Sequence, residues 1–245
     1  MNPNFSSFLK QNTEIKPLSA SLVDNESPFA VKEAYRALYT NILYLNIEDK
    51  CKKIVVTSAV SGEGKTTLSV NIALTLAQNL EGKRVLLIDA DMRRPCVAKM
   101  LSLGPRTHGL SEFLAGIDKD PHIDYIPQYK LAVLSAGGKN VNPTKLVGSE
   151  NMKRLITACE KEFDYIIIDT PPVTVVTDAI LLNNIANGYV IAARADHSNI
   201  NKISECVSKL EQVGAEIFGM IFLGEKIKKY NARYMRYDRY SSDQW

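Results

Sequence analysis

The segment IVVTSAVSGEGKTT, residues 54–67, restricts the possible folds of this chain more than any other segment. Residues 54–57 are β-branched, as in a buried strand, residues 61–64 have the composition of a turn, and a helical pattern runs from Lys65 through Leu76. This order predicts a phosphate-binding loop, because the backbone N–H groups of the turn and the positive end of the helix attract phosphate. A loop of this kind belongs to an α/β fold with a parallel sheet.

The turn and the start of the helix form the predicted nucleotide-binding set. Lys65 would supply a mobile cation, and the Thr66 hydroxyl can bind magnesium, so the expected ligand is ATP or another nucleoside triphosphate with its Mg²⁺. Ala59 stands where the usual pattern has its first glycine, and an ordinary strand-to-helix turn is the alternative interpretation. The full set is Ser61, Gly62, Glu63, Gly64, Lys65, Thr66 and Thr67.

Strand and helix patterns alternate along the rest of the chain. Further strands are predicted at 85–88, 130–138, 165–168, 188–195 and 216–223, and helices at 28–45, 110–114, 143–162, 177–184 and 199–212. Ser27 can cap the first helix with Pro28 at its first position, and Gly148 can delay the third helix to a cap at Ser149. The order predicts a doubly wound, mostly parallel sheet flanked by helices, the fold of P-loop NTPases.

Length and composition predict one domain with two tails. We expect an N-terminal arm at 1–27, the domain at 28–224 and a tail at 225–245. No stretch has the roughly 18 apolar residues of a membrane span, and the N-terminus lacks a secretory signal, so we expect a cytoplasmic protein. The cysteines at 51, 96, 159 and 206 are interpreted as reduced thiols, and His108, His122 and His197, without metal-ligand spacing, as surface or supporting residues.

Three carboxylates are expected beside the phosphate loop. Asp89 and Asp91 follow the predicted strand at 85–88, and Asp169 follows the strand at 165–168. Ligands of an open parallel sheet bind outside the carboxyl ends of its strands, where these side chains would meet Lys65 and Thr66. Each aspartate alone could be a cap or a turn residue, but together they suit Mg²⁺ and a triphosphate.

These motifs resemble a known family. SGEGKTT, LLIDADMRRP and IIIDTPPV are similar to the Walker A, A′ and B motifs of the bacterial tyrosine kinases of capsule and exopolysaccharide synthesis. The similarity runs from about Ser27 to the C-terminus and is strongest to the cytoplasmic catalytic chains of Gram-positive bacteria. Family members accept alanine at the position of Ala59, whereas many have proline at the position of Ser61.

The resemblance implies a role for each site residue. Lys65 would hold the β- and γ-phosphates, Thr66 would bind Mg²⁺, and Asp89 and Asp169 would complete or orient the metal shell. Asp91 would assist the incoming tyrosine hydroxyl. The helix EAYRALYTN is similar to a motif for ring-like self-association, E-x-x-R-x-x-R, and matches it at Glu33 and Arg36 but has Tyr39 at the second arginine.

The segment 225–245 is basic and rich in tyrosine. It contains six basic and three acidic residues, so it accounts for the whole net charge of +3. The spacing of its tyrosines would place them on one face of a helix packed on the sheet, and alternating Arg and Tyr could also bind nucleic acid. The resemblance favours a third interpretation, a flexible substrate of autophosphorylation. The tyrosines are Tyr230, Tyr234, Tyr237 and Tyr240.

Three function classes follow. The first is an ATP-dependent tyrosine kinase that modifies its own tail. The second is an ATPase switch of the partitioning or division-site type that dimerises around ATP, but this class has an early lysine in the loop where Val60 stands here. A nucleic-acid-binding module is disfavoured because the chain outside the tail is neutral. The kinase interpretation implies a membrane-anchored activator that recruits the chain to the membrane, a tyrosine phosphatase, and self-association of unphosphorylated chains.

Overall fold

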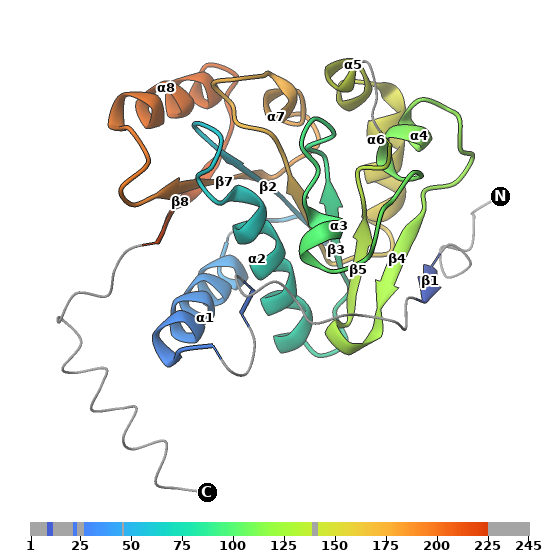
Figure 1. Ribbon diagram of the computed structural model, residues 1–245, viewed down its shortest axis with the longest axis horizontal. Coiled ribbons are helices and arrows are strands. Elements are labelled where there is room, and N and C mark those ends of the chain that lie inside the picture. The colour runs from blue at the N-terminus through green and yellow to red at the C-terminus, as the bar shows by residue number, and fades with distance from the viewer. Residues whose placement is uncertain (1–8, 12–21, 24–26, 46, 139–141, 225–245) are drawn as a thin grey trace, which may run out of the picture.

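The computed structural model describes residues 9–11, 22–23, 27–45, 47–138 and 142–224. It is an eight-stranded sheet covered by helices on both faces (Figure 1). The fold therefore confirms the predicted α/β class, while the tail tyrosines lie outside the described residues. Among the described residues no helix has both the length and the apolar composition that crossing a bilayer requires.

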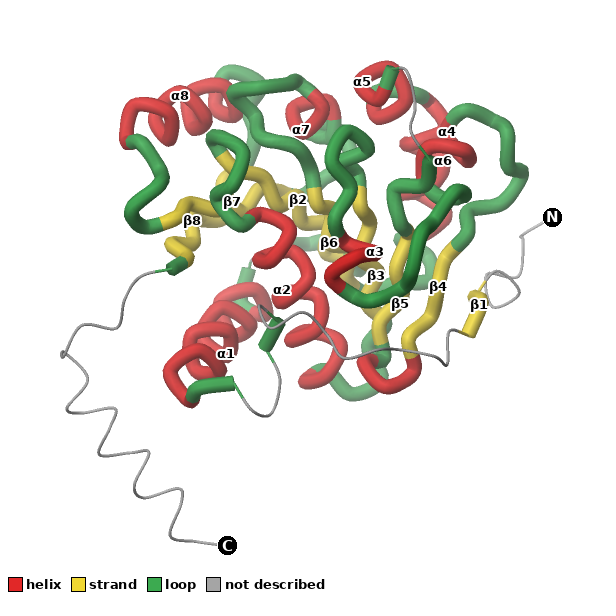
Figure 2. Tube along the Cα trace, in the orientation of Figure 1, coloured by secondary structure: helices red, strands yellow, loops and turns green. Residues whose placement is uncertain are grey.

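The strands follow the order β1-β4-β5-β3-β6-β2-β7-β8 across the sheet (Figure 2). All neighbours pair in parallel except β4 and β5, which are antiparallel. These two form a hairpin around the short 3-10 helix Pro127–Tyr129, in which β5 falls within the strand predicted at 130–138 and β4 was not predicted. The strands are β1 Leu9–Gln11, β2 Lys52–Ser58, β3 Val85–Asp89, β4 Ile123–Ile126, β5 Leu131–Leu134, β6 Tyr165–Asp169, β7 Gly188–Arg194 and β8 Ile217–Leu223.

The predicted helices occur in the predicted order and differ at some ends, whereas the short helix Val97–Met100 was not predicted. Pro28 is the N-cap of the first helix rather than its first residue, so the predicted cap at Ser27 was one position early. Gly148 divides the predicted helix at 143–162 in two, and the Ser149 hydroxyl caps the second part at Met152. The helices are α1 Phe29–Leu43, α2 Lys65–Asn79, α3 Val97–Met100, α4 Leu110–Leu114, α5 Pro143–Val147, α6 Glu150–Cys159, α7 Asp178–Leu181 and α8 Ile200–Glu211.

Two hydrophobic cores lie on opposite faces of the sheet. Side chains alternate along a strand, so Ile54 of β2 packs in the core beneath α1, α2 and α3, and Val55 packs in the core beneath α4 to α8. Both residues are fully buried. Burial on both faces explains why the central strands are continuous apolar runs.

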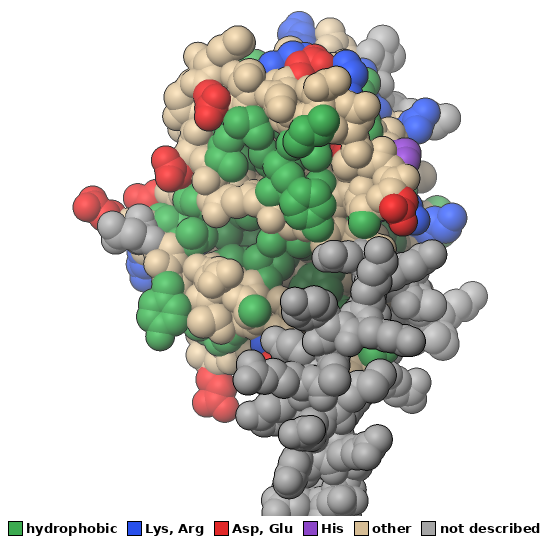
Figure 3. Space-filling view, turned by 90° about the vertical axis from the view of Figure 1, so that its left-hand side faces the viewer, with side chains coloured by type: hydrophobic (Ala, Val, Ile, Leu, Met, Phe, Trp, Pro, Cys, Tyr) green, Lys and Arg blue, Asp and Glu red, His purple; other side chains and the backbone are tan. Residues whose placement is uncertain are grey.

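The two ends of the sheet differ. Within the expected arm at 1–27, β1 pairs with β4 at one edge, and Leu22 is buried in the core that α2 covers. At the other edge, β8 is partly exposed along its length, and Phe222 is 59% exposed. Figure 3 looks at the side of the molecule that carries β8, α1 and α8, and hydrophobic side chains gather across its middle. The described part of the chain ends at Gly224, directly after β8.

Candidate active site

The phosphate loop and the predicted carboxylates meet at one edge of the sheet. Strand β6 lies between β2 and β3, and Asp169 at its end is the register partner of both Val56 and Asp89. The loop follows β2 directly, so the carboxyl ends of three adjacent strands form one site. The structure thus brings together Lys65, Thr66 and the three aspartates, as the sequence predicted.

Two glycines give the loop its shape. Gly62 and Gly64 have φ angles of 88° and 86°, which side chains with a Cβ rarely adopt. A Cβ at Gly64 would also lie 2.6 Å from Cδ1 of Leu223, at the end of β8. Ala59 needs no such freedom, because its φ is not positive and its methyl group is fully buried in the core. This explains physically why alanine is acceptable there.

Glu63 acts on the loop rather than on a ligand. Its side chain is fully buried, accepts a hydrogen bond from the Val60 N–H at 2.8 Å, and accepts another from the Ser198 hydroxyl. The neighbouring residue His197 also lies against the loop, with Nε2 3.1 Å from the carbonyl oxygen of Ser61. The Glu63 side chain therefore fixes the loop, and a role of Glu63 in nucleotide binding stays a prediction that concerns its backbone.

Lys65 forms an ion pair with Asp91, whose Oδ2 lies 2.6 Å from the ammonium nitrogen. Burial alone would lower the pKa of Lys65, but the charges of Asp169 and Asp91 outweigh it and raise the pKa above its usual value. The ammonium is therefore retained as a cation at this edge. A phosphate ligand would compete with Asp91 for it.

Thr66 and Asp169 are connected directly. The Thr66 hydroxyl donates to Oδ2 of Asp169 at 2.7 Å, and the Ser69 hydroxyl donates to Oδ1 at 3.0 Å. Sequence reasoning missed Ser69, although its position three residues after Thr66 places both on one helix face. Burial raises the pKa of Asp169, while Lys65 and these two hydroxyls oppose the rise.

Asp89 is held by backbone N–H groups. It accepts from Val97 at 3.1 Å and from Asp91 at 3.2 Å, and it is fully buried. Burial and the neighbouring charge of Asp169 raise the pKa of Asp89 well above its usual value. A cation arriving at this edge would reverse that effect, because it favours the ionised carboxylate.

The donor set suits a nucleotide with magnesium. Carboxylate and hydroxyl oxygens are the ligands that Mg²⁺ prefers, and Thr66, Asp89 and Asp169 supply them. The first N–H groups of α2 lack acceptors within the helix, and Lys65 adds a positive charge beside them. These residues could hold the ion and the phosphates together.

The remaining predicted pair lies on α1, and one ion pair near the acidic motifs was not predicted. Glu33 and Arg36 pair with each other on the exposed surface of α1, with Oε1 and Nη1 2.5 Å apart. Sequence reasoning did not find the contact of Arg93 with buried Asp178, at 3.1 Å. Arg93 follows the second acidic motif directly, and its position there was the available signal.

We predict that Asp169→Asn and Asp89→Asn each raise the magnesium concentration for half-maximal activity about 10- to 100-fold, because each removes a carboxylate charge. A magnesium titration of the kinase rate measures this. Asp49→Asn, an exposed carboxylate at the opposite end of β2, is the matched control and should titrate like the wild type. Unchanged titrations in both site variants would show that the metal assignment is wrong.

Comparisons with known proteins agree with this geometry. Residues 50–223 match the model of the ParA family, described as an NUBPL iron-transfer P-loop NTPase. The chain is 35% identical over 207 residues to the tyrosine-protein kinase CpsD of Streptococcus pneumoniae, an alignment that covers 81% of this chain and 87% of the relative. The solved kinase domain of the Escherichia coli tyrosine kinase ETK has a TM-score of 0.77 at 32% identity, covering 84% of this chain and 80% of that one.

A plasmid partition protein of Borrelia burgdorferi is a more distant neighbour. It has a TM-score of 0.56 at 20% identity, covers 78% of this chain and 87% of its own, and therefore shares the fold alone. The matches to CpsD and to the ETK kinase domain confirm the family that the three motifs indicated. The chain belongs to the bacterial tyrosine kinases, a branch of the ParA-type P-loop NTPases.

Proposed function

We propose that this chain is an ATP-dependent protein tyrosine kinase that phosphorylates its own C-terminal tyrosines and regulates the synthesis and export of capsular or extracellular polysaccharide. The observation that supports this best is the group formed by Lys65, Asp91 and Asp169 beside the phosphate loop. The Lys65 ammonium can bind phosphate, the Asp169 carboxylate can bind the metal ion, and the Asp91 carboxylate can accept a proton. Family membership adds the class of substrate, a tyrosine hydroxyl.

The ion pair suggests how the site is activated. When Lys65 turns to the phosphates, Asp91 loses its partner and becomes able to accept the proton of an incoming tyrosine hydroxyl. Magnesium, when bound, neutralises charge on the phosphates. Asp169 keeps the Thr66 hydroxyl oriented, and Asp89 keeps the segment from Asp91 to Val97 in place through two N–H groups. Both contacts position the site before any ligand arrives.

Incubation of the purified chain with labelled ATP, followed by detection of phosphotyrosine, tests the proposal. A kinase transfers label to its own tyrosines. A partitioning-type ATPase switch, the alternative, would hydrolyse ATP and dimerise without labelling protein. Its early loop lysine is replaced here by Val60, whose N–H is already bound to Glu63. Hydrolysis with no labelled tyrosine, with or without an activator peptide, would favour the alternative.

We further propose that a membrane-anchored activator of the polysaccharide co-polymerase type recruits this cytoplasmic chain to the membrane. The expected result is membrane localisation of a fluorescent fusion in cells that contain the activator, and diffuse fluorescence in cells deleted for it. A peptide from the activator's cytoplasmic segment should also raise the rate of autophosphorylation. Membrane localisation that survives deletion of every candidate activator would contradict the proposal.

We also propose a cycle in which unphosphorylated chains associate through α1 and phosphorylated chains separate. Glu33 and Arg36 are accessible, with side chains 35% and 63% exposed, and they satisfy each other within one chain. An intrahelical pair of this kind contributes only about 0.2–0.5 kcal/mol, so it can exchange for a contact between chains at little cost. A tyrosine phosphatase would then reset the cycle after phosphorylation separates the chains.

The double exchange Glu33→Arg with Arg36→Glu is expected to lower the mass of the assembly while leaving the melting temperature nearly unchanged. It preserves a charge pair within the helix but inverts the charges that a neighbouring chain would meet. Light scattering of the unphosphorylated protein measures the mass. The same exchange in α6, Glu150→Lys with Lys153→Glu, is the matched control, because it inverts another exposed pair three residues apart. An assembly of unchanged mass in the double variant would remove this surface from the interface.

A further inference from the structure

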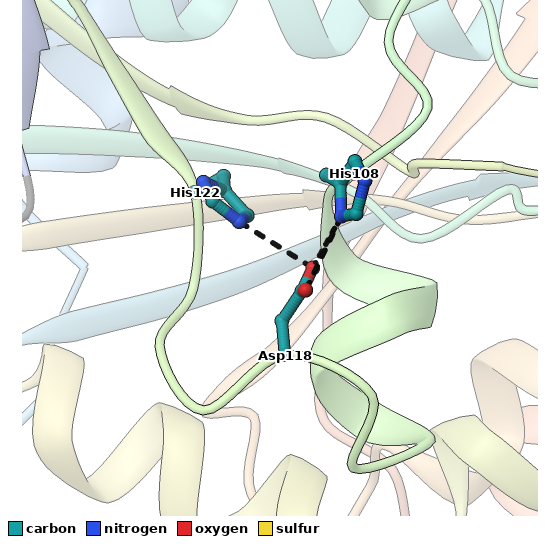
Figure 4. A group of neighbouring side chains, drawn as sticks. All are labelled: His108, Asp118 and His122. Atoms are coloured by element: carbon teal, nitrogen blue, oxygen red, sulfur yellow. Dashed lines mark hydrogen bonds and ion pairs between the residues drawn. The ribbon is translucent and has the colours of Figure 1, made fainter.

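Two histidines and an aspartate meet at a second place on the molecule. His108 precedes α4, Asp118 follows it, and His122 precedes β4 (Figure 4). Nδ1 of His108 lies 2.9 Å from Oδ2 of Asp118, and Nε2 of His122 lies 3.4 Å from the same oxygen. Both ring nitrogens in Figure 4 thus point toward one carboxylate. The two histidines are 14 positions apart in the sequence, a spacing that gave no such indication.

The backbone beneath this group is fixed. Gly109, next to His108, donates to the Glu112 carboxylate at 2.9 Å, and Leu110 donates to the Ser135 carbonyl at 2.8 Å. The N–H of Asp118 donates to the carbonyl of Glu112 at 3.2 Å.

His122 is fixed through the neighbouring strand. It directly precedes Ile123, which pairs with Leu134 at the end of β5. All three side chains are therefore attached to one end of β5 through short connections. Groups held in this way need little reorganisation to bind a common ligand.

The chemistry of the group suits a borderline transition-metal cation. Zinc binds imidazole nitrogen and carboxylate oxygen at about 2.0–2.2 Å, which sets tetrahedral ligands about 3.4 Å apart. The two nitrogen-to-oxygen distances, 2.9 and 3.4 Å, already lie near that value, and all three ligand atoms lie within 4.8 Å of one another. The nearby cation Arg106 lies 3.0 Å from Asp124, which balances its charge.

We propose that His108, Asp118 and His122 form a zinc site, with Nδ1 of His108, Nε2 of His122 and one oxygen of Asp118 as ligands. His108 and His122 are 56% and 37% exposed at their side chains, so an ion can enter and a water molecule can complete the coordination. The bound ion joins the connections before and after α4. It lies beside β4, on the same edge of the sheet as the candidate active site but beyond β5, and its ligands are separate from Asp89 and Asp169.

Nitrogen-15 spectroscopy of histidine-labelled protein tests the site directly. The chain has three histidines, so each imidazole can be assigned by substitution. One molar equivalent of zinc, added with excess magnesium, should shift Nδ1 of His108 and Nε2 of His122 and leave His197 unchanged. His108→Ala should abolish the shift at His122, and His122→Ala the shift at His108, whereas His197→Ala should preserve both. If zinc binds instead at the carboxylates of the nucleotide site, the ring signals of His108 and His122 will not shift, and the proposal is wrong.

Two further readouts separate the proposal from its competitors. Cobalt should replace zinc without a thiolate-to-cobalt absorption band, because the exposed thiol of Cys96 is not a ligand. Zinc should raise the melting temperature of the wild type but not of the His108→Ala, His122→Ala double variant. Ring signals of His108 and His122 that do not respond to zinc in the folded protein would overturn the proposal and leave a hydrogen-bonded cluster. Binding that persists unchanged in the double variant would overturn it as well.

Discussion

Lys65→Ala is expected to lower the rate of phosphotyrosine formation by about 10²- to 10³-fold or more, because it removes a preorganised charge from the transferring phosphoryl group. Lys65 is the cation that the structure places against Asp91, under the influence of Asp169. The same variant should bind ATP more weakly. Time courses of phosphotyrosine formation, measured on protein with a native circular-dichroism spectrum, give the rate.

The matched control is Lys83→Ala. Lys83 also pairs with an aspartate, Asp164 at 2.9 Å, but lies before β3 at the opposite edge of the sheet. It should retain the wild-type rate. Lys65 is outside both hydrophobic cores, so its loss should not unfold the protein. A folded Lys65→Ala protein with the wild-type rate would exclude this residue from the mechanism.

Replacing all four tail tyrosines with phenylalanine is expected to remove nearly all autophosphorylation while preserving ATP hydrolysis. Each phosphate adds about −1.5 to −2 charges, so four of them change the tail from +3 to roughly −3 to −5. Phosphorylated tails should then repel one another and the acidic edge, with salt weakening the effect. Mass spectrometry of the phosphorylated sites measures the first effect. The four residues are Tyr230, Tyr234, Tyr237 and Tyr240.

Light scattering before and after ATP addition measures the effect on assembly. The wild type should dissociate after ATP, and the variant with four phenylalanines should keep its mass. Tyr44→Phe is the control, because Tyr44 is a tyrosine 83% exposed on the body of the protein. If wild type and variant have the same mass throughout, the tail does not govern assembly.

The site was more predictable from the sequence than the fold around it. Strand β2, the loop and α2 are adjacent in the chain, and parallel strands end at one edge, so the meeting of Lys65 with Asp91 and Asp169 followed from local pattern and topology. The hairpin of β4 and β5 did not follow. Strand β4 has four residues, of which the middle two are half-buried, and its position depends on pairing with β5 rather than on its own pattern.

Side-chain contacts between distant segments were also unpredictable. Glu63 and Ser198 lie 135 positions apart, and nothing in either segment indicates that a buried carboxylate there holds the loop instead of a ligand. The group of His108, Asp118 and His122 could not be predicted either, because its members approach one another only after β4 pairs with β5. In both cases a long-range pairing, which a single sequence does not encode locally, decides which polar groups become neighbours.

The side chain of Leu223 lies beside Gly64, close enough that an added Cβ would clash with it, so the described chain ends next to its own phosphate loop. Tyr230 comes seven residues after Leu223, so covalent geometry keeps the two residues within about 23–25 Å of each other. A short tether corresponds to an effective concentration on the order of millimolar. If the tail is the substrate proposed above, an added tyrosine peptide must compete with a tyrosine tethered to the same chain, and we expect free peptides to show a poor apparent affinity.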